Sequence, residues 1–238
     1  MINILYEDDA LVVCVKPVGV LSQPDVSGEG EDMLSLLAAY LGEKSGKKEP
    51  YVGLVHRLDR GVGGVMVFAK RQDVAARLSV AVAERRVTKQ YLAVVHGRPA
   101  ENEGIFQDFL YKDSTKGKSF VVSSERRGVK KASLAYRVLE TVTDTAQGER
   151  SLVQIRLHTG RTHQIRVQFS SRGMPLVGDG KYGARDHGCP IGLWSYRLTF
   201  AHPTKKGQTV DIACLPTDSP FDLFESITPA DELPDARV

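Results

Sequence analysis

The order of strand-like and helix-like segments constrains the fold most strongly. Apolar or alternating runs typical of strands occur at 11–15, 64–69, 89–96, 134–142, 151–157, 193–200 and 209–214. Helical patterns occur at 32–41 and 72–86, and Thr162 is a suitable N-cap for a third helix that ends near Arg172. Because the helices stand between groups of strands and do not alternate with them, we predict an α+β fold: a large mixed, mainly antiparallel sheet with flanking helices.

The length of the chain sets the scale of this fold. With 238 residues, 42% of them hydrophobic, the chain can build one large core or two small ones, and we expect a single domain over 1–238. The segment 228–238 contains prolines and acidic residues, and we expect it to form a loose C-terminal tail.

The segment 55–64 places one carboxylate among basic side chains. Asp59 has His56, Arg57 and Arg60 as neighbours in the sequence, and nearby positive charge favours the ionised form of a carboxylate. Glycine occupies three of the next five positions, and glycine lets a ligand approach the backbone closely. We predict that Asp59 lies on a loop beside a strand as an accessible nucleophile or base. For this residue alone, an Arg–Asp pair that closes a surface turn is the alternative.

A second polar motif follows the strand predicted at 151–157. Gly160 interrupts the chain, and on the helix expected after it His163, Arg166 and Ser170 share one face. Arg166 is then expected to point away from the apolar side. Helix N-termini and arginine forks both suit phosphate or carboxylate partners.

Four motifs occur in the order typical of RluA-type pseudouridine synthases, and the chain resembles that family from about Ile4 to about Cys214. The motifs are His-Arg-Leu-Asp at 56–59 and the segments 89–97, 159–166 and 174–179. The resemblance implies the pseudouridine synthase catalytic fold in a single catalytic domain. It also implies isomerisation of uridine within RNA: the bond from ribose to N1 breaks, the uracil turns, and a carbon–carbon bond forms at C5. One departure is 61–64, which is Gly-Val-Gly-Gly where family members often have Asp-Thr-Ser-Gly.

The resemblance assigns roles to single residues. Asp59 matches the essential aspartate, Tyr91 the active-site tyrosine, and Arg166 the basic residue that pairs with the aspartate. For Tyr91, the residues alone favour an ordinary half-buried strand tyrosine. Contacts to RNA or substrate are expected from His56, Arg57, Arg60, Arg161, His163, Gln164 and Leu176, and Arg161 is a second candidate for the basic partner of Asp59.

The chemistry of the implied reaction suits these residue types. Breaking a nucleoside bond builds positive charge on the ribose, which a fixed anion such as the Asp59 carboxylate stabilises. Attack at C1′ and removal of the C2′ proton both remain open for Asp59. The freed uracil must be held away from water, and a base near C5, for which Tyr91 is the candidate, must finally remove a proton.

Basic residues are clustered although the net charge is only +3. Only Asp113 and Glu125 oppose a group of eight cations, which are Lys112, Lys116, Lys118, Arg126, Arg127, Lys130, Lys131 and Arg137. Such clustering is typical of a surface that binds a polyanion. For 112–131 taken alone, a solvated and partly mobile loop is an equally good interpretation.

The remaining composition excludes several classes of protein. No segment approaches the ~18 to 20 apolar residues of a membrane span, and no signal core follows the N-terminus, so we expect a cytoplasmic protein. Three widely spaced cysteines indicate neither a disulfide framework nor a zinc site, and we expect no metal and no organic cofactor. The first strand begins so early that we expect no N-terminal S4-type module.

The expected partner is therefore RNA, not DNA or a membrane, and the protein is expected to be a monomer. The expected substrate is a stem-loop of 23S ribosomal RNA or of transfer RNA, because a uridine is most easily flipped out of a loop. Two alternatives remain. One is a nucleoside hydrolase that admits water and releases uracil, and the other is an RNA-binding or ribosome-assembly protein on a synthase scaffold with dispensable chemistry.

Overall fold

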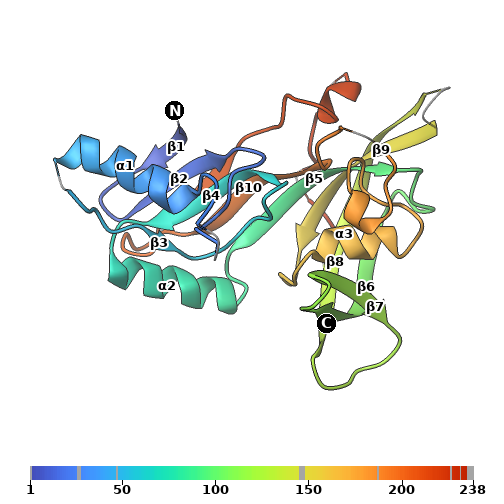
Figure 1. Cartoon of the computed structure of the whole chain (residues 1–238), viewed down its shortest axis with the longest axis horizontal. Coiled ribbons are helices and arrows are strands. Elements are labelled where there is room, and N and C mark those ends of the chain that lie inside the picture. The colour runs from blue at the N-terminus through green and yellow to red at the C-terminus, as the bar shows by residue number, and fades with distance from the viewer. Residues whose placement is uncertain are drawn as a thin grey trace. The chain divides into compact units, whose positions relative to one another are not determined.

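The structure is a computed structural model of the chain. It describes residues 2–25, 28–46, 48–144, 148–186, 188–225, 227–230 and 232–234 (Figure 1). The chain divides into two compact units, and it passes between them three times: within strand β5, within strand β10 and after Leu215. The first unit comprises Met1–Lys89 and Ser195–Leu215, and the second comprises Gln90–Trp194 and Pro216–Val238.

The first unit is a sheet with two helices. Strand β4 (Gly63–Ala69) lies between β2 (Leu11–Lys16) and β10 (Leu193–Ala201), and β1 (Asn3–Glu7) extends the sheet beyond β2. Two further strands, β3 (Gly53–Leu54) and β11 (Thr209–Ala213), pair with β4 and β10 respectively. The helices are α1 (Met33–Ser45), which Asp32 caps by accepting hydrogen bonds from two backbone N–H groups, and α2 (Gln72–Ala83).

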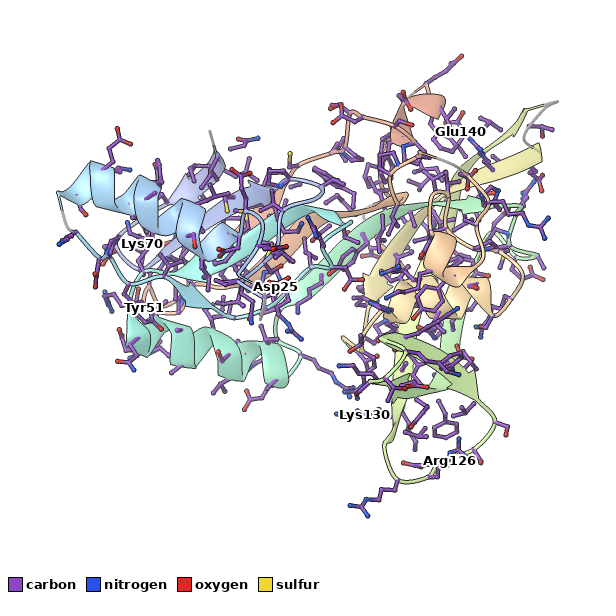
Figure 2. The ribbon with its side chains drawn as sticks, viewed as in Figure 1. Asp25, Tyr51, Lys70, Arg126, Lys130 and Glu140 are labelled. Carbon is purple, nitrogen blue, oxygen red and sulfur yellow. The ribbon has the colours of Figure 1, made fainter. Side chains whose placement is uncertain are left out.

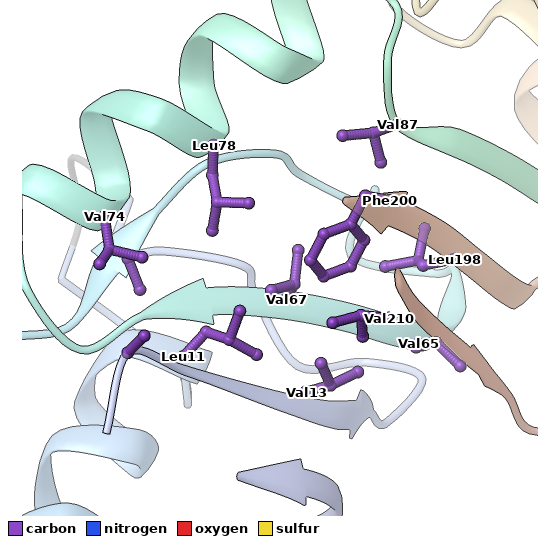
Figure 3. Packing of buried hydrophobic residues seen from close by; sticks show 12 residues of the cluster. Leu11, Val13, Val65, Val67, Val74, Leu78, Val87, Leu198, Phe200 and Val210 are labelled. Carbon is purple, nitrogen blue, oxygen red and sulfur yellow. The ribbon is translucent and has the colours of Figure 1, made fainter. Parts of the chain in front are cut away.

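The core of the first unit lies between this sheet and α2. Every residue of β2 and of β4 is buried, as expected for strands that are covered on both faces. From α2, Val74 and Leu78 point one turn apart onto the sheet. Figure 3 shows them above side chains from four strands, namely Leu11, Val13, Val65, Val67, Leu198, Phe200 and Val210.

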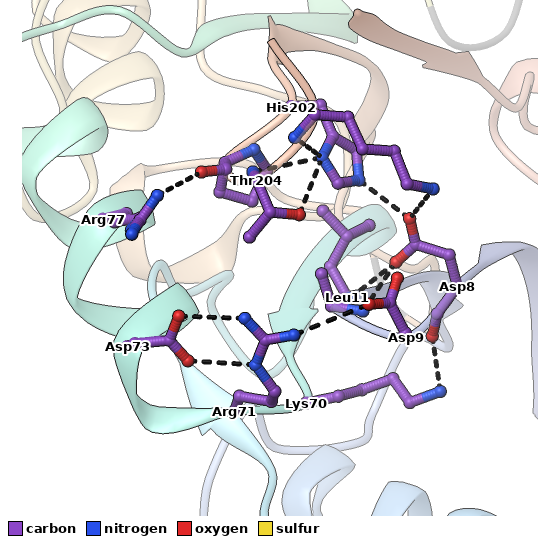
Figure 4. A network of polar contacts seen from close by, with 12 residues as sticks. Asp8, Asp9, Leu11, Lys70, Arg71, Asp73, Arg77, His202 and Thr204 are labelled. Atoms are coloured by element: carbon purple, nitrogen blue, oxygen red, sulfur yellow. Dashed lines mark hydrogen bonds and ion pairs between the residues drawn. The ribbon is translucent and has the colours of Figure 1, made fainter.

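A polar network closes the edge of the first unit at the turn between β1 and β2 (Figure 4). The Asp8 carboxylate accepts hydrogen bonds from the backbone N–H groups of Ala10 and Leu11. It also accepts from Lys205 at 2.7 Å and from Nε2 of His202 at 2.8 Å. Because Nδ1 of the buried His202 ring accepts from two backbone N–H groups, this ring joins the β10–β11 turn to the β1–β2 turn.

The second unit is built from five strands and one short helix. The strands follow the order β5-β9-β8-β6-β7, and the pairs β6–β7, β6–β8 and β8–β9 are antiparallel. Helix α3 (Gln164–Ser170) contacts β6 and β7, and two 3₁₀ turns, η1 (Gly180–Tyr182) and η2 (Phe221–Leu223), follow it. The strand bounds are Thr88–His96 for β5, Glu103–Asp113 for β6, Lys118–Val122 for β7, Val129–Asp144 for β8 and Gly148–Leu157 for β9.

The predicted fold class is confirmed, since the strands form a mainly antiparallel sheet with flanking helices. Four strands were not predicted, namely β1, β3, β6 and β7. For the segment 112–131, a surface that binds a polyanion and a solvated loop were equally good interpretations. In the structure this segment contains the end of β6, all of β7 and the start of β8. The expectation of one catalytic domain over 1–238 stays a prediction.

Part of the segment expected to be a loose tail is held against β9. The side-chain amide of Gln154 donates to the carbonyl of Ala230 and accepts from its N–H. Arg156 donates to the carbonyls of Leu233 and Pro234, and Leu233 is buried. Residues 231 and 235–238 of that prediction lie outside the described residues. In the described part of the chain, no helix combines the length and the apolar character needed to cross a bilayer.

The first unit should lose stability in acid through Glu7. Burial raises the pKa of Glu7, but hydrogen bonds from Lys44, Lys70 and Tyr40 outweigh burial and lower it from 4.5 to about 2. The stabilisation is therefore present above pH 4.5 and is lost as the pH falls toward 2. Glu7→Gln should cost about 1–2 kcal/mol at pH 7 and flatten the dependence of unfolding free energy on pH in that window. Urea unfolding between pH 2.5 and 7 measures this dependence. Glu84→Gln, at an exposed position, is the control, and its unfolding free energy should vary with pH as that of the unchanged protein does.

Candidate active site

Asp59 lies on the loop between β3 and β4 and is half-buried. The preceding residue, Leu58, anchors this loop: its N–H donates to the Ser22 hydroxyl at 3.0 Å, and the same hydroxyl donates to its carbonyl at 2.8 Å. On the other side, the N–H of Val62 donates to the carbonyl of Asp59 and closes a turn. The backbone around the carboxylate is thus fixed, as a preorganised catalytic group requires.

A buried lysine that the sequence analysis did not select supports the same loop. The ammonium group of Lys16 is completely buried and donates to the carbonyls of Pro17 at 2.9 Å, Val20 at 2.5 Å and Arg60 at 3.2 Å. Burial lowers the pKa of Lys16 to about 8, while the negative charge of Asp59 acts in the opposite direction. A cation thus sits within electrostatic reach of Asp59, and it comes from 43 positions earlier in the chain.

The basic neighbours of Asp59 in the sequence behave differently from one another. Arg57 and Arg60 are exposed, and Arg60 donates through Nε to the carbonyl of Gly19. His56 is buried, and its Nε2 accepts a hydrogen bond from the N–H of Val67. Burial, followed by the charge of Lys89, lowers the pKa of His56 to about 3. His56 is therefore neutral at pH 7, which corrects the expectation that it adds positive charge beside Asp59.

The glycines after Asp59 do not all serve a ligand. Gly64 has φ +120°, and a Cβ atom there would lie 2.2 Å from the carbonyl oxygen of Ser195 on β10. Only glycine allows the two strands to approach so closely. Position 64 is the one place within 61–64 where this chain agrees with the family motif, and packing of β4 against β10 demands glycine there.

The second unit carries Arg166 on α3 in a buried ion pair. Its Nε donates to Oδ2 of Asp179 at 2.6 Å and its Nη2 donates to Oδ1 at 2.8 Å. Asp179 is completely buried and Arg166 is 6% exposed. Charges about 4 Å apart attract by about 4 kcal/mol at an effective dielectric of about 20, which offsets much of the cost of burying both groups. The fork fixes the plane of the guanidinium group.

The start of α3 differs from the prediction. The helix begins at Gln164, and the N-cap is His163 with φ 53° and ψ 28°, so Thr162 is not the cap and the helix ends at Ser170. A histidine in the left-handed region is strained, and such strain persists only where the surroundings impose it. Here Nδ1 of His163 forms a hydrogen bond of 2.9 Å with the Tyr182 hydroxyl. All residues from Gln164 to Phe169 are buried, so the face of α3 that carries Arg166 is buried as well.

Three other predicted residues have structural contacts. Gln164 accepts from the Thr159 hydroxyl at 2.7 Å and from the N–H of Arg161 at 3.0 Å, which braces the turn before α3. Arg161 donates through Nε to the carbonyl of Lys131 on β8. Leu176 is completely buried and forms an isolated bridge with Val95 of β5. RNA contacts by these residues stay predictions.

Tyr91 and Asp59 belong to different units. Tyr91 lies on β5 and is 6% exposed. Arg166 belongs to the second unit as well, so the pairing of Asp59 with Arg166 stays a prediction. The sequence did not reveal roles for Lys16, Asp179 and Tyr182, and of these only Asp179 lies within one of the four motifs, at 174–179.

Cations and aromatic rings alternate over the hairpin of β6 and β7 and the start of β8. Arg126 lies over Tyr111, Lys131 over Phe109, and both Lys116 and Lys118 lie near the Phe120 ring, all with 5.8–6.0 Å to the ring centroid. We call this group, with Arg127 and Lys130, the basic hairpin. Figure 2 shows Arg126 at its tip and Lys130 on β8. The surface has the positive charge that a phosphate backbone needs.

Among the described side chains, no three His, Cys, Asp or Glu residues form a group that could hold a metal ion. Cys14, Cys189 and Cys214 form no disulfide with one another.

Comparison with known proteins places these residues in a family. The family model described as RNA pseudouridylate synthase matches residues 10–171. An uncharacterized RNA pseudouridine synthase of Aquifex aeolicus is 34% identical over 217 residues, which cover 86% of this chain and 66% of that protein. The ribosomal large subunit pseudouridine synthase D of Borreliella burgdorferi is 35% identical over 203 residues, which cover 83% and 60%. The chain thus spans less than two thirds of the length of both relatives.

Solved structures give the same result for the fold. Human RNA pseudouridylate synthase domain containing 4 matches with a TM-score of 0.73 and 25% identity, over 90% of this chain and 88% of that chain. Human RNA pseudouridylate synthase domain containing 1 matches with a TM-score of 0.72 and 24% identity.

The buried pair on α3 should contribute strongly to stability. Asp179→Asn removes the carboxylate and leaves the Arg166 charge in a buried site, which should lower the free energy of unfolding by about 3–5 kcal/mol. Asp211→Asn is a matched control, because Asp211 accepts the same two-point hydrogen bonds from Arg197 but both groups are about a third exposed. It should cost about 1 kcal/mol or less. Urea unfolding of both variants decides the matter, and equal losses would contradict the account.

Proposed function

Because the chain belongs to the RNA pseudouridylate synthase family, we propose that it isomerises uridine to pseudouridine in structured RNA. The observation that carries this proposal is the placement of Asp59 on an anchored loop, half-buried and within electrostatic reach of the buried ammonium of Lys16. An anion held in this way suits a reaction that builds positive charge on a ribose.

Asp59 supplies the first step of the proposed reaction. The N1–C1′ bond breaks with its electron pair going to the uracil, and the carboxylate stabilises the positive charge left on the sugar. It does so as a nucleophile at C1′ or as the base that removes the C2′ proton, and both routes require the ionised form. The uracil then turns, C5 bonds to C1′, and the C5 proton leaves, so that the product is an isomer of the substrate.

Tyr91 and Arg166 complete the proposed machinery. Tyr91 is buried on β5, where its ring can stack on the target base or its oxygen can receive the C5 proton. Arg166 is oriented by Asp179. Its proposed role is to pair with Asp59 and to keep that carboxylate ionised and directed at the sugar.

RNA is the proposed partner, bound in part by the basic hairpin. We favour a stem-loop of ribosomal RNA over one of transfer RNA, because several relatives are named ribosomal large subunit pseudouridine synthase D. A monomer in the cytoplasm, without DNA or membrane partners, completes the proposal.

Asp59→Asn tests the reaction. The amide keeps the shape of the side chain but carries no negative charge, so formation of pseudouridine should fall below detection while RNA affinity changes by less than a few-fold. The measurement is nucleoside analysis of a ribosomal RNA transcript after incubation with purified protein. Asp9→Asn, at an exposed position on the β1–β2 turn, is the control and should retain full activity. Free uracil among the products would instead identify a nucleoside hydrolase.

Equal nucleoside profiles for the unchanged protein and Asp59→Asn on every RNA tested would contradict the enzymatic proposal. With RNA binding intact, that result would favour an RNA-binding or assembly protein on a synthase scaffold.

The basic hairpin should set the salt dependence of RNA binding. Replacing one contacting cation by glutamine should lower the slope of log affinity against log salt by roughly 0.7 on single-stranded RNA. The measurement is a binding titration at several salt concentrations with a variant that lacks all six cations: Lys116, Lys118, Arg126, Arg127, Lys130 and Lys131. Replacement of Arg71, Arg77, Arg85 and Arg86 beside α2 is the control. An unchanged slope in the sixfold variant would show that these cations form only a solvated surface.

A further inference from the structure

A single 3₁₀ turn supplies two groups that contact Arg166. Asp179 precedes η1 and Tyr182 ends it, and the N–H of Tyr182 donates to the carbonyl of Asp179 at 2.9 Å. Residues three apart lie on the same side of a 3₁₀ turn, so the carboxylate and the ring point in the same direction. Both groups are buried, with Asp179 0% and Tyr182 5% exposed.

The ring of Tyr182 fixes the guanidinium group from its face. The Cζ atom of Arg166 lies 5.1 Å from the ring centroid, while Nε and Nη2 are held by Asp179. A planar cation that is bonded along one edge and covered on one face keeps little rotational freedom. Asp179 sets the plane of the group through two hydrogen bonds, and the ring adds a contact at the face of that plane.

The same side chain is joined to the basic hairpin. Lys118 places Nζ 4.8 Å from the centroid of the Tyr182 ring. The Tyr182 hydroxyl accepts a hydrogen bond from the N–H of Ser119 at 2.8 Å, and the Ser119 hydroxyl donates to the carbonyl of Thr162 at 2.7 Å. Tyr182 thus connects the start of β7 with the turn that precedes α3.

These contacts are more than core packing requires. Tyr182 does pack against the apolar side chains of Leu110, Ala132 and Val167. A leucine or a phenylalanine would fill that space as well, and neither would need partners for a hydroxyl group. Two cations on the ring and two hydrogen bonds at the hydroxyl are polar features that a purely apolar role leaves unexplained.

We propose that Tyr182 is a positioning residue for Arg166. Its ring holds the guanidinium in the plane that Asp179 sets, and its hydroxyl ties this assembly to β7, so that the basic hairpin and the guanidinium keep a constant spacing. The importance of this for catalysis rests on the proposed function, in which Arg166 directs Asp59.

Two variants of Tyr182 and two of a matched tyrosine test the proposal. Tyr182→Leu removes the ring, and Tyr182→Phe removes only the hydroxyl. Tyr136 is the matched residue, since it is in the same unit, is also 5% exposed, and packs its ring against Phe106 and Phe169 at 4.6 and 6.0 Å. Tyr136→Leu and Tyr136→Phe therefore report what the loss of a buried ring or hydroxyl costs in general.

The first readout needs no RNA. In ¹⁵N NMR spectra, the Nε–H signal of Arg166 is identified by its loss in Arg166→Lys, and its rate of exchange with water is measured. Tyr182→Leu should raise this rate on the order of tenfold, because the cation–π contact is lost, while Tyr182→Phe should stay within about threefold. Tyr136→Leu should leave the rate unchanged. Equal rates in the two leucine variants would overturn the proposal.

The second readout separates rate from binding. At saturating RNA, Tyr182→Leu should slow pseudouridine formation on the order of tenfold, with a change of less than about threefold in the RNA concentration for half-saturation. In an Arg166→Lys background, the same replacement should cause no further loss, because it acts through Arg166. An additive loss would overturn the proposal. If the unchanged protein forms no pseudouridine but the exchange rates follow expectation, the proposed function fails and the positioning role stands.

Discussion

The buried ion pair between Arg166 and Asp179 is the interaction on which the candidate site depends most. The Arg166 side chain is buried, and a carboxylate that accepts hydrogen bonds from two of its N–H groups at 2.6 and 2.8 Å stabilises its charge there. The same constraint operates in the first unit, where three backbone carbonyls surround the buried ammonium of Lys16. Each unit thus holds a buried cation. In the first unit the hydrogen bonds of Lys16 support the loop that carries Asp59, and in the second unit Asp179 orients the Arg166 side chain.

The sequence predicted the architecture well, because burial on both faces leaves a strong local pattern. The continuous apolar runs of β2 and β4 and the alternation in β9 were confirmed as strands. The strands β6 and β7 were missed because their half-exposed faces mix charged and aromatic side chains, as in the cross-strand pair Tyr111 and Phe120. Such pairs depend on register between distant segments, and no local period reveals them.

The candidate site could be predicted only in part, for a similar reason. Asp59 stands out because its motif is local, whereas the burial of Lys16 depends on a carbonyl 44 residues away. His56 was counted among the basic neighbours of Asp59, but its ring is buried and its Nε2 accepts from the N–H of Val67, so that it is neutral. The pairing of Asp179 with Arg166 and the contacts of Tyr182 follow from how η1 lies against α3, and this packing has no signature in the residues themselves.

The central claim is that the Asp59 carboxylate performs chemistry on a uridine in cellular RNA. Its most direct test is a map of pseudouridine across all RNA from cells that lack the protein, complemented either with the unchanged chain or with Asp59→Asn. The account predicts at least one uridine that is converted to pseudouridine in cells complemented with the unchanged chain. The same uridine should stay unmodified in cells that lack the protein and in cells that carry Asp59→Asn. A map in which Asp59→Asn restores every site, or in which no site depends on the protein, would contradict it.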